Sequence, residues 1–314
     1  MNEGVRRILE QMERNGYITD SEIATAVYLA MELRKPLLIE GQAGVGKTEI
    51  AKVLSSMLDV DLIRLQCYEG LDVNTALYEW NYPKQMLRIK MEEHDRRSVA
   101  EKEHEIFSED FLLKRPLLEA ITRQDKAPVL LIDEVDRADE EFEAFLLEVL
   151  SDFQVSIPEI GTVKATHVPY VVLTSNRTRE LSDALRRRCL FFWIDYPSFE
   201  KEVRVVKAKV PGVNDALADQ ICMFMQGVRS VRLIKTPGVA ETLDWGMALV
   251  SLHRDHLDEE NVRDTLVAFL KDNRDVQKMS GKRLDVLLSA VSGDGRPPGD
   301  IIPALRQQLT ALEV

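Results

Sequence analysis

The residue types most suited to chemistry begin with a glycine-rich loop that leads into a lysine and a threonine. The loop reads Gly41-Gln42-Ala43-Gly44-Val45-Gly46-Lys47-Thr48 and matches the pattern G-x-x-x-x-G-K-[ST] in full. Glycine tolerates positive φ, so the backbone can turn its amide groups toward phosphate oxygens. We expect Lys47 to reach the β- and γ-phosphates and the Thr48 hydroxyl to contact Mg²⁺. The loop therefore predicts a site for ATP with Mg²⁺.

Two acids follow a second apolar segment. Val129–Ile132 is continuously apolar and runs directly into Asp133 and Glu134. Such a run is typical of a central parallel strand that is covered on both faces. We expect Asp133 to hold Mg²⁺ through water and Glu134 to polarise the attacking water as general base. The acids that come next are typical of a solvated helix start, namely Asp136, Asp139, Glu140, Glu141 and Glu143.

An asparagine ends a further apolar run. Asn176 follows Val171–Ser175, and its amide can hydrogen-bond the γ-phosphate or the attacking water. An Asx turn that closes the strand is the alternative interpretation. With the two preceding motifs, Asn176 becomes the third candidate for catalysis.

Three consecutive arginines precede the last apolar run of this region. Arg186, Arg187 and Arg188 are too many for one buried ion pair, so they predict a negatively charged partner. A guanidinium can stabilise charge on a transferring phosphoryl group when it arrives from a neighbouring chain. This interpretation predicts a ring in which the next subunit completes each site. Solubility is the alternative role for any single arginine.

These motifs require an α/β region to position them. Apolar runs and turn residues predict strands at the following places: Pro36–Glu40, Asp61–Gln66, Pro128–Asp133, Tyr170–Leu173 and Leu190–Ile194. Asp152–Thr166 alternates and predicts a β-hairpin. Helical spacing predicts one helix from Thr75 to about Lys90, another over Leu112–Arg123 and a third whose apolar stripe includes Phe142 and Leu146. The expected fold class is α/β, a P-loop parallel sheet flanked by helices.

After Pro197 the pattern becomes all helical. We expect an N-terminal helix or linker at 1–18, a nucleotide-binding domain at 19–197 and a helical lid domain at 198–314. The lid helices are expected over Phe199–Lys209, Asn214–Val231, Val239–His253, Glu260–Lys271, Arg283–Ser292 and Ile302–Leu312. Ser292–Asp300 reads as a flexible linker. The charged stretch 91–109 fits an exposed helix, an insertion or a mobile loop, and its charge favours a solvated face over a binding segment.

Composition narrows the functional classes. The 314 residues carry a formal net charge of −12, which disfavours general nucleic-acid binding because phosphate contacts supply most of that affinity. No apolar run approaches the length of a membrane span, and the charged N-terminus lacks the apolar core of a signal peptide. Three cysteines, an odd and sparse set, fit a reducing compartment, so we expect a cytoplasmic protein.

The order of these motifs resembles AAA+ ATPases. The phosphate loop, V-L-L-I-D-E, a helix, a hairpin, V-V-L-T-S-N and A-L-R-R-R-C follow one another as in that class. The chain is similar to the MoxR family in particular, and within it to the CoxD-like branch, over roughly residues 19–250. The most specific segments are Phe111–Ile121, Ile132–Leu150 and Ala240–Trp245.

The resemblance implies residue roles. Gly41–Thr48 would be Walker A, Asp133 and Glu134 Walker B, and Asn176 sensor 1. Arg188 best matches the arginine finger, with Arg187 as the fallback. The hairpin would be the pre-sensor hairpin, and an insertion typical of the clade would fall near Tyr78–Arg88. The chain departs from the family at the start of a lid helix, because Lys235–Glu241 contains no arginine for the sensor 2 position.

The resemblance also implies partners. It suggests a homo-oligomeric ring, expected to be a hexamer, which remodels or matures a protein client in the manner of a chaperone. The CoxD-like branch points to a molybdenum hydroxylase of the CO dehydrogenase type as client, and the family to a partner with a von Willebrand factor A domain. Three other functions remain open from the residues: a P-loop small-molecule kinase, a non-hydrolysing nucleotide switch and, less favoured by the acidic charge, a DNA-directed motor.

Overall fold

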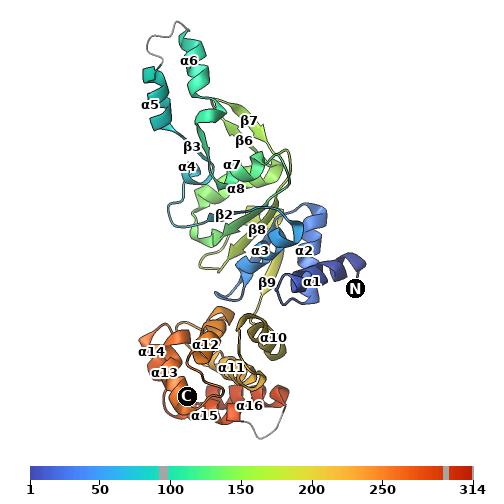
Figure 1. The fold of residues 1–314 in the computed structure, drawn as a ribbon, viewed down its shortest axis with the longest axis vertical. Helices are drawn as coiled ribbons and strands as arrows, with labels where there is room; N and C mark the ends of the chain where they lie inside the picture. The colour runs from blue at the N-terminus through green and yellow to red at the C-terminus, as the bar shows by residue number, and fades with distance from the viewer. Residues whose placement is uncertain (92–97, 293–296, 313–314) are drawn as a thin grey trace. The chain divides into compact units, whose positions relative to one another are not determined.

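The computed structural model describes residues 1–91, 98–292 and 297–312, and the chain forms two compact units (Figure 1). The first unit comprises Met1–Gly41 and Lys47–Ile194, and the second comprises Gln42–Gly46 and Asp195–Val314. The middle residues of the glycine-rich loop, Gln42–Gly46, thus group with the C-terminal part of the chain. Among the described residues no helix is both long and apolar enough to cross a membrane.

The first unit is built on a five-stranded parallel sheet with the order β2-β5-β8-β1-β9. Its strands are β1 (Leu37–Gly41), β2 (Leu62–Gln66), β5 (Val129–Asp133), β8 (Tyr170–Ser175) and β9 (Leu190–Ile194). Every residue of β1 and β5 is buried, which explains their continuous apolar character. The expected parallel sheet is confirmed.

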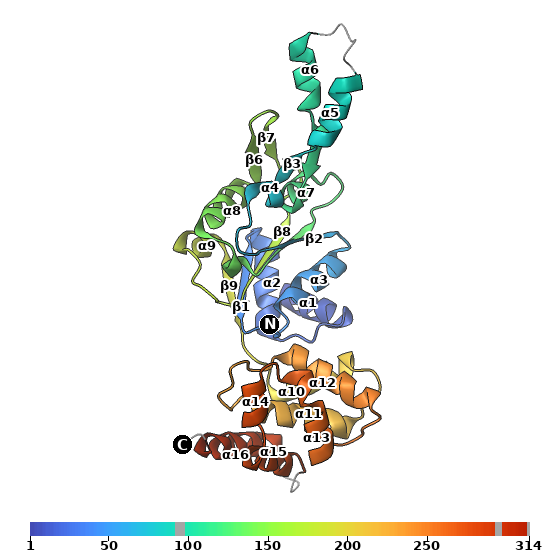
Figure 2. The same ribbon diagram turned by 90° about the vertical axis from the view of Figure 1, so that its left-hand side faces the viewer.

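Helices cover this sheet on both faces (Figures 1 and 2). They are α1 (Glu3–Arg14), α2 (Ser21–Leu33), α3 (Lys47–Leu58), α7 (Pro116–Thr122), α8 (Glu140–Asp152) and α9 (Asp183–Arg188). Local signals set their starts. The Asp20 side chain accepts from the Ile23 amide at the start of α2, and Asp139 accepts from the Phe142 amide at the start of α8.

The helix predicted from Thr75 to about Lys90 is only partly correct because a short strand interrupts it, and the helix predicted over Leu112–Arg123 forms over Pro116–Thr122 only. The chain instead forms α4 (Val73–Ala76), β3 (Tyr78–Trp80), α5 (Tyr82–Met91), α6 (Val99–Ile106), a 3-10 turn η1 (Glu109–Phe111) and β4 (Leu112–Lys114) before α7. β3 and β4 pair antiparallel, with Tyr78 opposite Lys114. Because this pairing joins residues far apart in sequence, helical spacing alone does not reveal it. The segment between the paired strands β3 and β4 therefore continues beyond Arg88, where the resemblance would end the insertion.

Part of the charged stretch 91–109 is an exposed helix. Residues 92–97 lie outside the described residues. Ser98 is the N-cap of α6, and its side chain forms a capping box with Glu101. α5 and α6 lie side by side in Figures 1 and 2, and Arg88 of α5 pairs with Glu105 of α6. The stretch contributes one side of a helical hairpin.

The predicted β-hairpin is confirmed. β6 (Gln154–Ile157) and β7 (Gly161–Lys164) pair antiparallel, with Ile157 opposite Gly161. Gly161 has φ +94°, a left-handed conformation that favours glycine at the turn.

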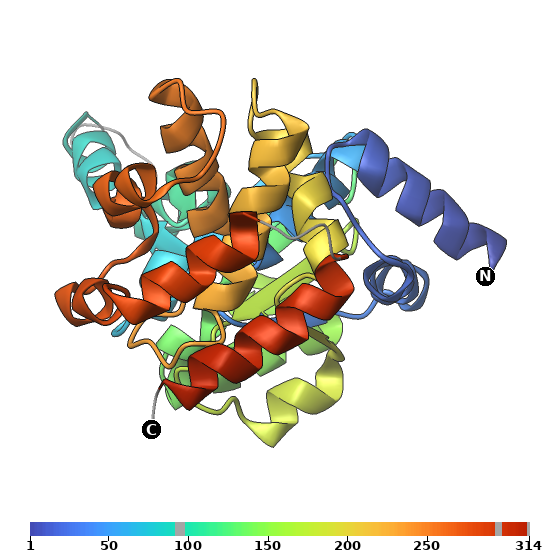
Figure 3. The same cartoon turned by 90° about the horizontal axis from the view of Figure 1, so that it is seen from below.

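The second unit is helical beyond Asp195. Its helices are α10 (Phe199–Lys209), α11 (Asp215–Val228), α12 (Val239–Ser251), α13 (Glu259–Phe269), α14 (Asn273–Lys278), α15 (Lys282–Ser292) and α16 (Pro298–Ala311). Phe224, Trp245 and Phe269 meet in its core with ring centroids 4.6–6.0 Å apart. Figure 3 shows the two red C-terminal helices, α15 and α16, next to each other.

The predicted linker Ser292–Asp300 is partly wrong. Residues 293–296 lie outside the described residues, but α16 begins at Pro298. Proline in the first turn of a helix loses no intrahelical hydrogen bond, so a proline pair can mark a helix start as well as a loop. The short helix α14 also went unpredicted.

Candidate nucleotide site

The sequence motifs meet at the carboxyl ends of three neighbouring strands. β5, β8 and β1 are adjacent in the sheet, and they end at Asp133, Ser175 and Gly41. Ligands of open parallel sheets bind outside this edge. α3 begins with Lys47 and Thr48, so it brings the cation and the hydroxyl to the same edge.

Lys47 is 7% exposed and is held by two acceptors of the first unit. Its Nζ donates to the Gly41 carbonyl at 2.8 Å and to Asn176 Oδ1 at 2.7 Å. Burial lowers the pKa of Lys47, while Asp136, Asp133 and Glu134 act in the opposite direction. The structure thus joins the lysine of the loop to the asparagine at the end of β8.

The glycines of the loop adopt the conformation that the pattern predicts. Gly44 has φ +74° and Gly46 has φ +92°. The loop packs within the second unit, where the Ala240 amide donates to the Gly44 carbonyl at 3.1 Å. A Cβ on Gly238 would lie 2.6 Å from the Ala43 carbonyl oxygen. A glycine occupies this point of close backbone approach, in the segment Lys235–Glu241, which contains no arginine.

Thr48 and Asp133 lie side by side. Thr48 Oγ1 donates to Asp133 Oδ1 at 3.1 Å, and Thr174 Oγ1 donates to the same oxygen. The second oxygen of Asp133 accepts from Arg64, with Nε at 3.1 Å. A hydroxyl and a carboxylate in contact supply the oxygen ligands that Mg²⁺ prefers. The oxygen atoms of Thr48 and Asp133 therefore fit Mg²⁺, the metal that the sequence predicts.

Glu134 turns its carboxylate toward the same group. Its φ of +54° is left-handed, which is uncommon for a residue with a Cβ and frequent at functional sites. The Glu134 amide donates to Thr174 Oγ1 at 2.9 Å. Its carboxylate accepts from Asn176 Nδ2 at 3.3 Å and from Gln66 Nε2 at 3.0 Å. Asn176 thus bridges Lys47 and Glu134.

Sequence reasoning did not identify Arg64, Gln66, Thr174 or Arg137, each of which contacts Asp133 or Glu134. Arg64 and Gln66 are two positions apart on β2, so their side chains share a face. Gln66 lies opposite Asp133 in the β2–β5 register. Polar residues at alternate positions of an otherwise apolar strand were the available signal. It becomes interpretable only when β2 is known to lie next to β5.

Two acids that the sequence placed at a solvated helix start are buried. Asp136 is 2% exposed and accepts from the Asn176 amide at 3.2 Å and from the Thr178 amide at 2.8 Å. Burial raises the pKa of Asp136, but these hydrogen bonds and one from the Thr178 hydroxyl lower it overall. Glu143 is 1% exposed and pairs with Arg179. Both acids are buried because their carboxylates bind residues that follow β8 in the chain.

The arginine run divides into different environments. Arg186 Nη2 lies 2.5 Å from Glu40 Oε1, and Glu40 is 1% exposed. Arg188 is exposed, and its Nε donates to Ser151 Oγ at 2.7 Å near the end of α8. Arg187 is exposed as well. One arginine therefore does serve a buried ion pair, and the other two face solvent in the first unit.

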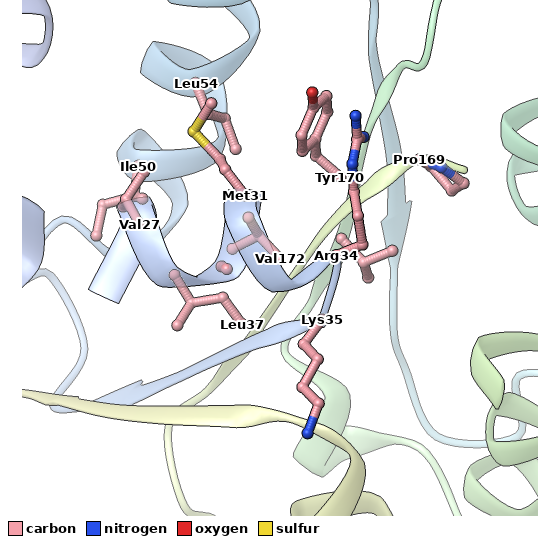
Figure 4. A pocket seen from close by; sticks show the side chains of 12 residues that line it. Val27, Met31, Arg34, Lys35, Leu37, Ile50, Leu54, Pro169, Tyr170 and Val172 are labelled. Carbon is pink, nitrogen blue, oxygen red and sulfur yellow. The ribbon is translucent and has the colours of Figure 1, made fainter. Parts of the chain in front are cut away.

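A separate small hollow lies near the opposite ends of the strands. Figure 4 shows it between α2, α3 and the first residues of β1 and β8, with Met31, Leu54 and Val172 among its apolar side chains. Arg34 stacks over the Tyr170 ring, with its guanidinium carbon 4.4 Å from the centroid. Its lining contains no carboxylate, so it lacks the acid that the phosphate edge supplies.

Comparison with known proteins agrees with the sheet and its motifs. Residues 36–189 match the family model described as AAA domain (dynein-related subfamily). This part of the first unit is therefore similar to an AAA domain, and the chain continues into a helical region. The matched segment includes every candidate side chain of the phosphate edge, from Lys47 to Asn176.

Similar curated proteins come from staphylococci. An uncharacterised protein of Staphylococcus haemolyticus (strain JCSC1435) is 25% identical over 278 residues, which cover 85% of this chain and 96% of that protein. An uncharacterised protein of Staphylococcus aureus (strain bovine RF122 / ET3-1) is 26% identical over 220 residues, 68% of this chain and 75% of that protein.

Among solved structures, the Thermotoga maritima RuvB Holliday junction branch migration motor is 17% identical, with a TM-score of 0.46, and the match covers 94% of this chain and 81% of that one. A point variant of the same RuvB is 16% identical with a TM-score of 0.49, covering 96% of this chain and 82% of that one.

Proposed function

We propose that the chain, which is similar to an AAA domain over residues 36–189, is an ATPase that hydrolyses ATP with Mg²⁺ and uses the energy to remodel a protein client. One observation carries the proposal. Lys47, Thr48, Asp133, Glu134 and Asn176 converge at one sheet edge. Hydrogen bonds connect Asn176 to Lys47 and to Glu134, and Thr48 to Asp133. A site that only bound phosphate would have no use for a carboxylate held beside the lysine and the asparagine.

Each side chain has a role that its contacts support. The loop Gly41–Thr48 and the Lys47 ammonium bind the phosphates. Thr48 and Asp133 hold Mg²⁺, which neutralises phosphate charge when bound. Glu134 takes the proton of the attacking water. Asn176 fixes the positions of the Glu134 and Lys47 side chains relative to each other because it hydrogen-bonds to both.

We further propose that each site is completed by a second copy of this chain in a ring, with a hexamer as the expected assembly. Arg188 is exposed and held by Ser151, so it is presented at the surface of the first unit. From a neighbouring copy, its guanidinium would stabilise the charge that develops on the transferred phosphoryl group. Arg187, exposed beside it, is the fallback for the same role.

A protein client is supported by the helical insertion. α5 exposes five large apolar side chains on a helix of ten residues: Tyr82, Met86, Leu87, Ile89 and Met91. Apolar clusters on a surface mark interaction sites. The client and partner that the sequence resemblance suggests are a molybdenum hydroxylase and a protein with a von Willebrand factor A domain. Co-purification of the tagged Glu134→Gln protein in the presence of ATP tests both.

The decisive experiment separates the two halves of the shared site. Glu134→Gln and Arg188→Ala are each expected to keep ATP binding and to lose hydrolysis, the second by about 10³-fold. Mixing the two variants should restore activity, since about a quarter of the sites in a mixed ring then pair an intact Glu134 with a neighbour's intact Arg188. Arg263→Ala, a surface arginine of α13, serves as control.

Three outcomes would contradict the proposal. If the Glu134→Gln variant still hydrolysed ATP, Glu134 would not be the general base. Full activity of the Arg188→Ala variant, or no recovery of activity on mixing, would refute the proposal that two subunits share each site. Transfer of phosphate to a small molecule in place of water would establish a kinase.

A further inference from the structure

Glu40 is a buried carboxylate for which the proposed reaction supplies no role. It is the fourth residue of β1, directly before Gly41 at the start of the phosphate loop. Its exposure is 1%. Burying a charged carboxylate is costly unless partners compensate it. The partners of Glu40 therefore indicate what this position is for.

Two arginines from different parts of the first unit meet this carboxylate. Arg186 Nη2 of α9 lies 2.5 Å from Glu40 Oε1. Arg177 Nε lies 3.6 Å from Glu40 Oε2, and Arg177 directly follows Asn176. The two arginine side chains are partly exposed, at 31% and 49%. Only the acid is fully buried, so it acts as a fixed anchor for two surface segments.

Glu40 lies on β1, between β8 and β9, the two strands next to which Arg177 and Arg186 lie in the chain. Glu40 lies opposite Ser175 of β8 and opposite Trp193 of β9. β8 leads into Asn176 and Arg177, and β9 is preceded by α9. The guanidinium of Arg186 also lies over the Phe191 ring, with 5.6 Å from its central carbon to the centroid.

α9 needs such an anchor because it is short. It spans six residues, Asp183–Arg188, and helices of that length are unstable on their own. Leu185 buries its apolar side chain, and Arg186 adds the ion pair with Glu40. Arg187 and Arg188 follow at once, so the orientation of these two exposed arginines depends on where Arg186 is held.

We propose that Glu40 is a positioning residue that holds α9 so that its exposed arginines reach the nucleotide site of a second copy of this chain. The inference rests on the proposed shared site. Glu40 itself touches neither substrate nor metal. It acts through Arg186, and the same carboxylate adjoins Gly41 and faces Arg177. One buried acid thereby connects a subunit's own phosphate edge to the arginines that it offers to its neighbour.

The test is Glu40→Gln, which keeps the size of the side chain and removes its charge. We expect ATP binding and KM close to wild type and a fall in kcat of at least about tenfold, because the phosphate contacts remain and the arginines are misplaced. Mixing Glu40→Gln with Glu134→Gln should restore activity. The Glu40→Gln subunit keeps its own base, and its neighbour supplies correctly held arginines.

Recovery on mixing separates this role from a merely structural one. If loss of Glu40 damaged the subunit's own phosphate loop, a neighbour with intact arginines would not repair it. A double-mutant cycle adds a second readout. Arg186→Gln should reproduce the defect, and Glu40→Gln with Arg186→Gln should be no worse than either alone. Arg177→Gln, which removes the more distant partner, should cost less.

The outcomes are distinguishable. Wild-type kcat in Glu40→Gln would overturn the inference, and so would a failure to recover on mixing while Arg188→Ala does recover with Glu134→Gln. If Arg188→Ala fails to recover, the shared site is wrong and this inference falls with it. Should Glu40→Gln not fold, Arg186→Gln at its partly exposed position decides the question by the same mixing experiment.

Discussion

Lys47 carries its charge in a place that is almost closed to water. The side chain is 7% exposed and bonds to the Gly41 carbonyl and to Asn176. Because burial lowers the pKa of Lys47, its surroundings disfavour the charged form relative to the unfolded chain. A phosphate would relieve this cost by adding negative charge. If the proposed site binds phosphate, Lys47 lowers the stability of the ligand-free protein and contributes to the affinity.

Lys47→Met tests both effects. Without nucleotide we expect a melting temperature a few degrees above wild type, since an apolar side chain removes the cost of burying the ammonium, by about 1 kcal/mol. ATP with Mg²⁺ should raise the melting temperature of the wild type and leave the variant unchanged. Lys52→Met, at an exposed position of the same helix, is the control and should keep the ATP-induced rise.

The stability difference between the wild type and Lys47→Met should depend on pH, and the direction of this dependence follows from the pKa shift of Lys47. The folded-state pKa of Lys47 is lower than its value of 10.5 in an unfolded chain, so between the two values the unfolded chain binds more protons. Wild-type stability from this group therefore rises with pH across that window, and the advantage of Lys47→Met shrinks. Thermal melts of both proteins over alkaline pH check it, and an advantage that widened with pH would refute the assignment.

At the scale of elements, α8 shows how local and tertiary signals combine. Its apolar stripe, spaced by three and four, packs into the core through Phe142, Leu146, Val149 and Leu150. Asp139 begins the helix by accepting from the Phe142 amide at 2.8 Å. Since α8 follows the acids of β5 and precedes the hairpin, its first turn determines the direction in which the chain leaves the candidate site.

Asp139→Ala is expected to lower the free energy of unfolding by about 1 kcal/mol, because the first turn of α8 loses its side-chain acceptor. Urea denaturation measures the change. Glu140→Ala removes a neighbouring, exposed acid that caps nothing in α8 and should cost only a few tenths of a kcal/mol. Equal losses in the two variants would show that charge near the helix start matters and the cap does not.

For the whole molecule, the proposed ring makes activity depend on concentration. A site that lacks a neighbour's arginine should hydrolyse ATP slowly, so the rate per chain should rise with protein concentration until assembly is complete. Steady-state ATPase measured across a dilution series, alongside sedimentation of the same samples, checks this. A constant rate per chain through dissociation of the assembly would leave the arginines without the proposed role.

Much of the site could be predicted because its motifs are contiguous. Each of Gly41–Thr48, Asp133-Glu134 and Asn176 follows an apolar run, and parallel strands bring such ends to one edge. Arg64 and Thr174 escaped prediction because their partner, Asp133, lies on other strands. Asp136 was assigned to solvent because its burial depends on the turn after β8, which no local pattern describes.

By itself, the sequence determined the parallel strands, the hairpin and the residue types at the phosphate edge, because these depend on short-range periodicity and on apolar runs. Only the tertiary structure decided that Asn176 joins Lys47 to Glu134, and that β3 pairs with β4. It also decided that Arg186 belongs to buried Glu40 while Arg187 and Arg188 stay exposed. The physical reason is common to all three: each rests on a contact between residues distant in sequence, whose geometry exists only after the sheet has formed.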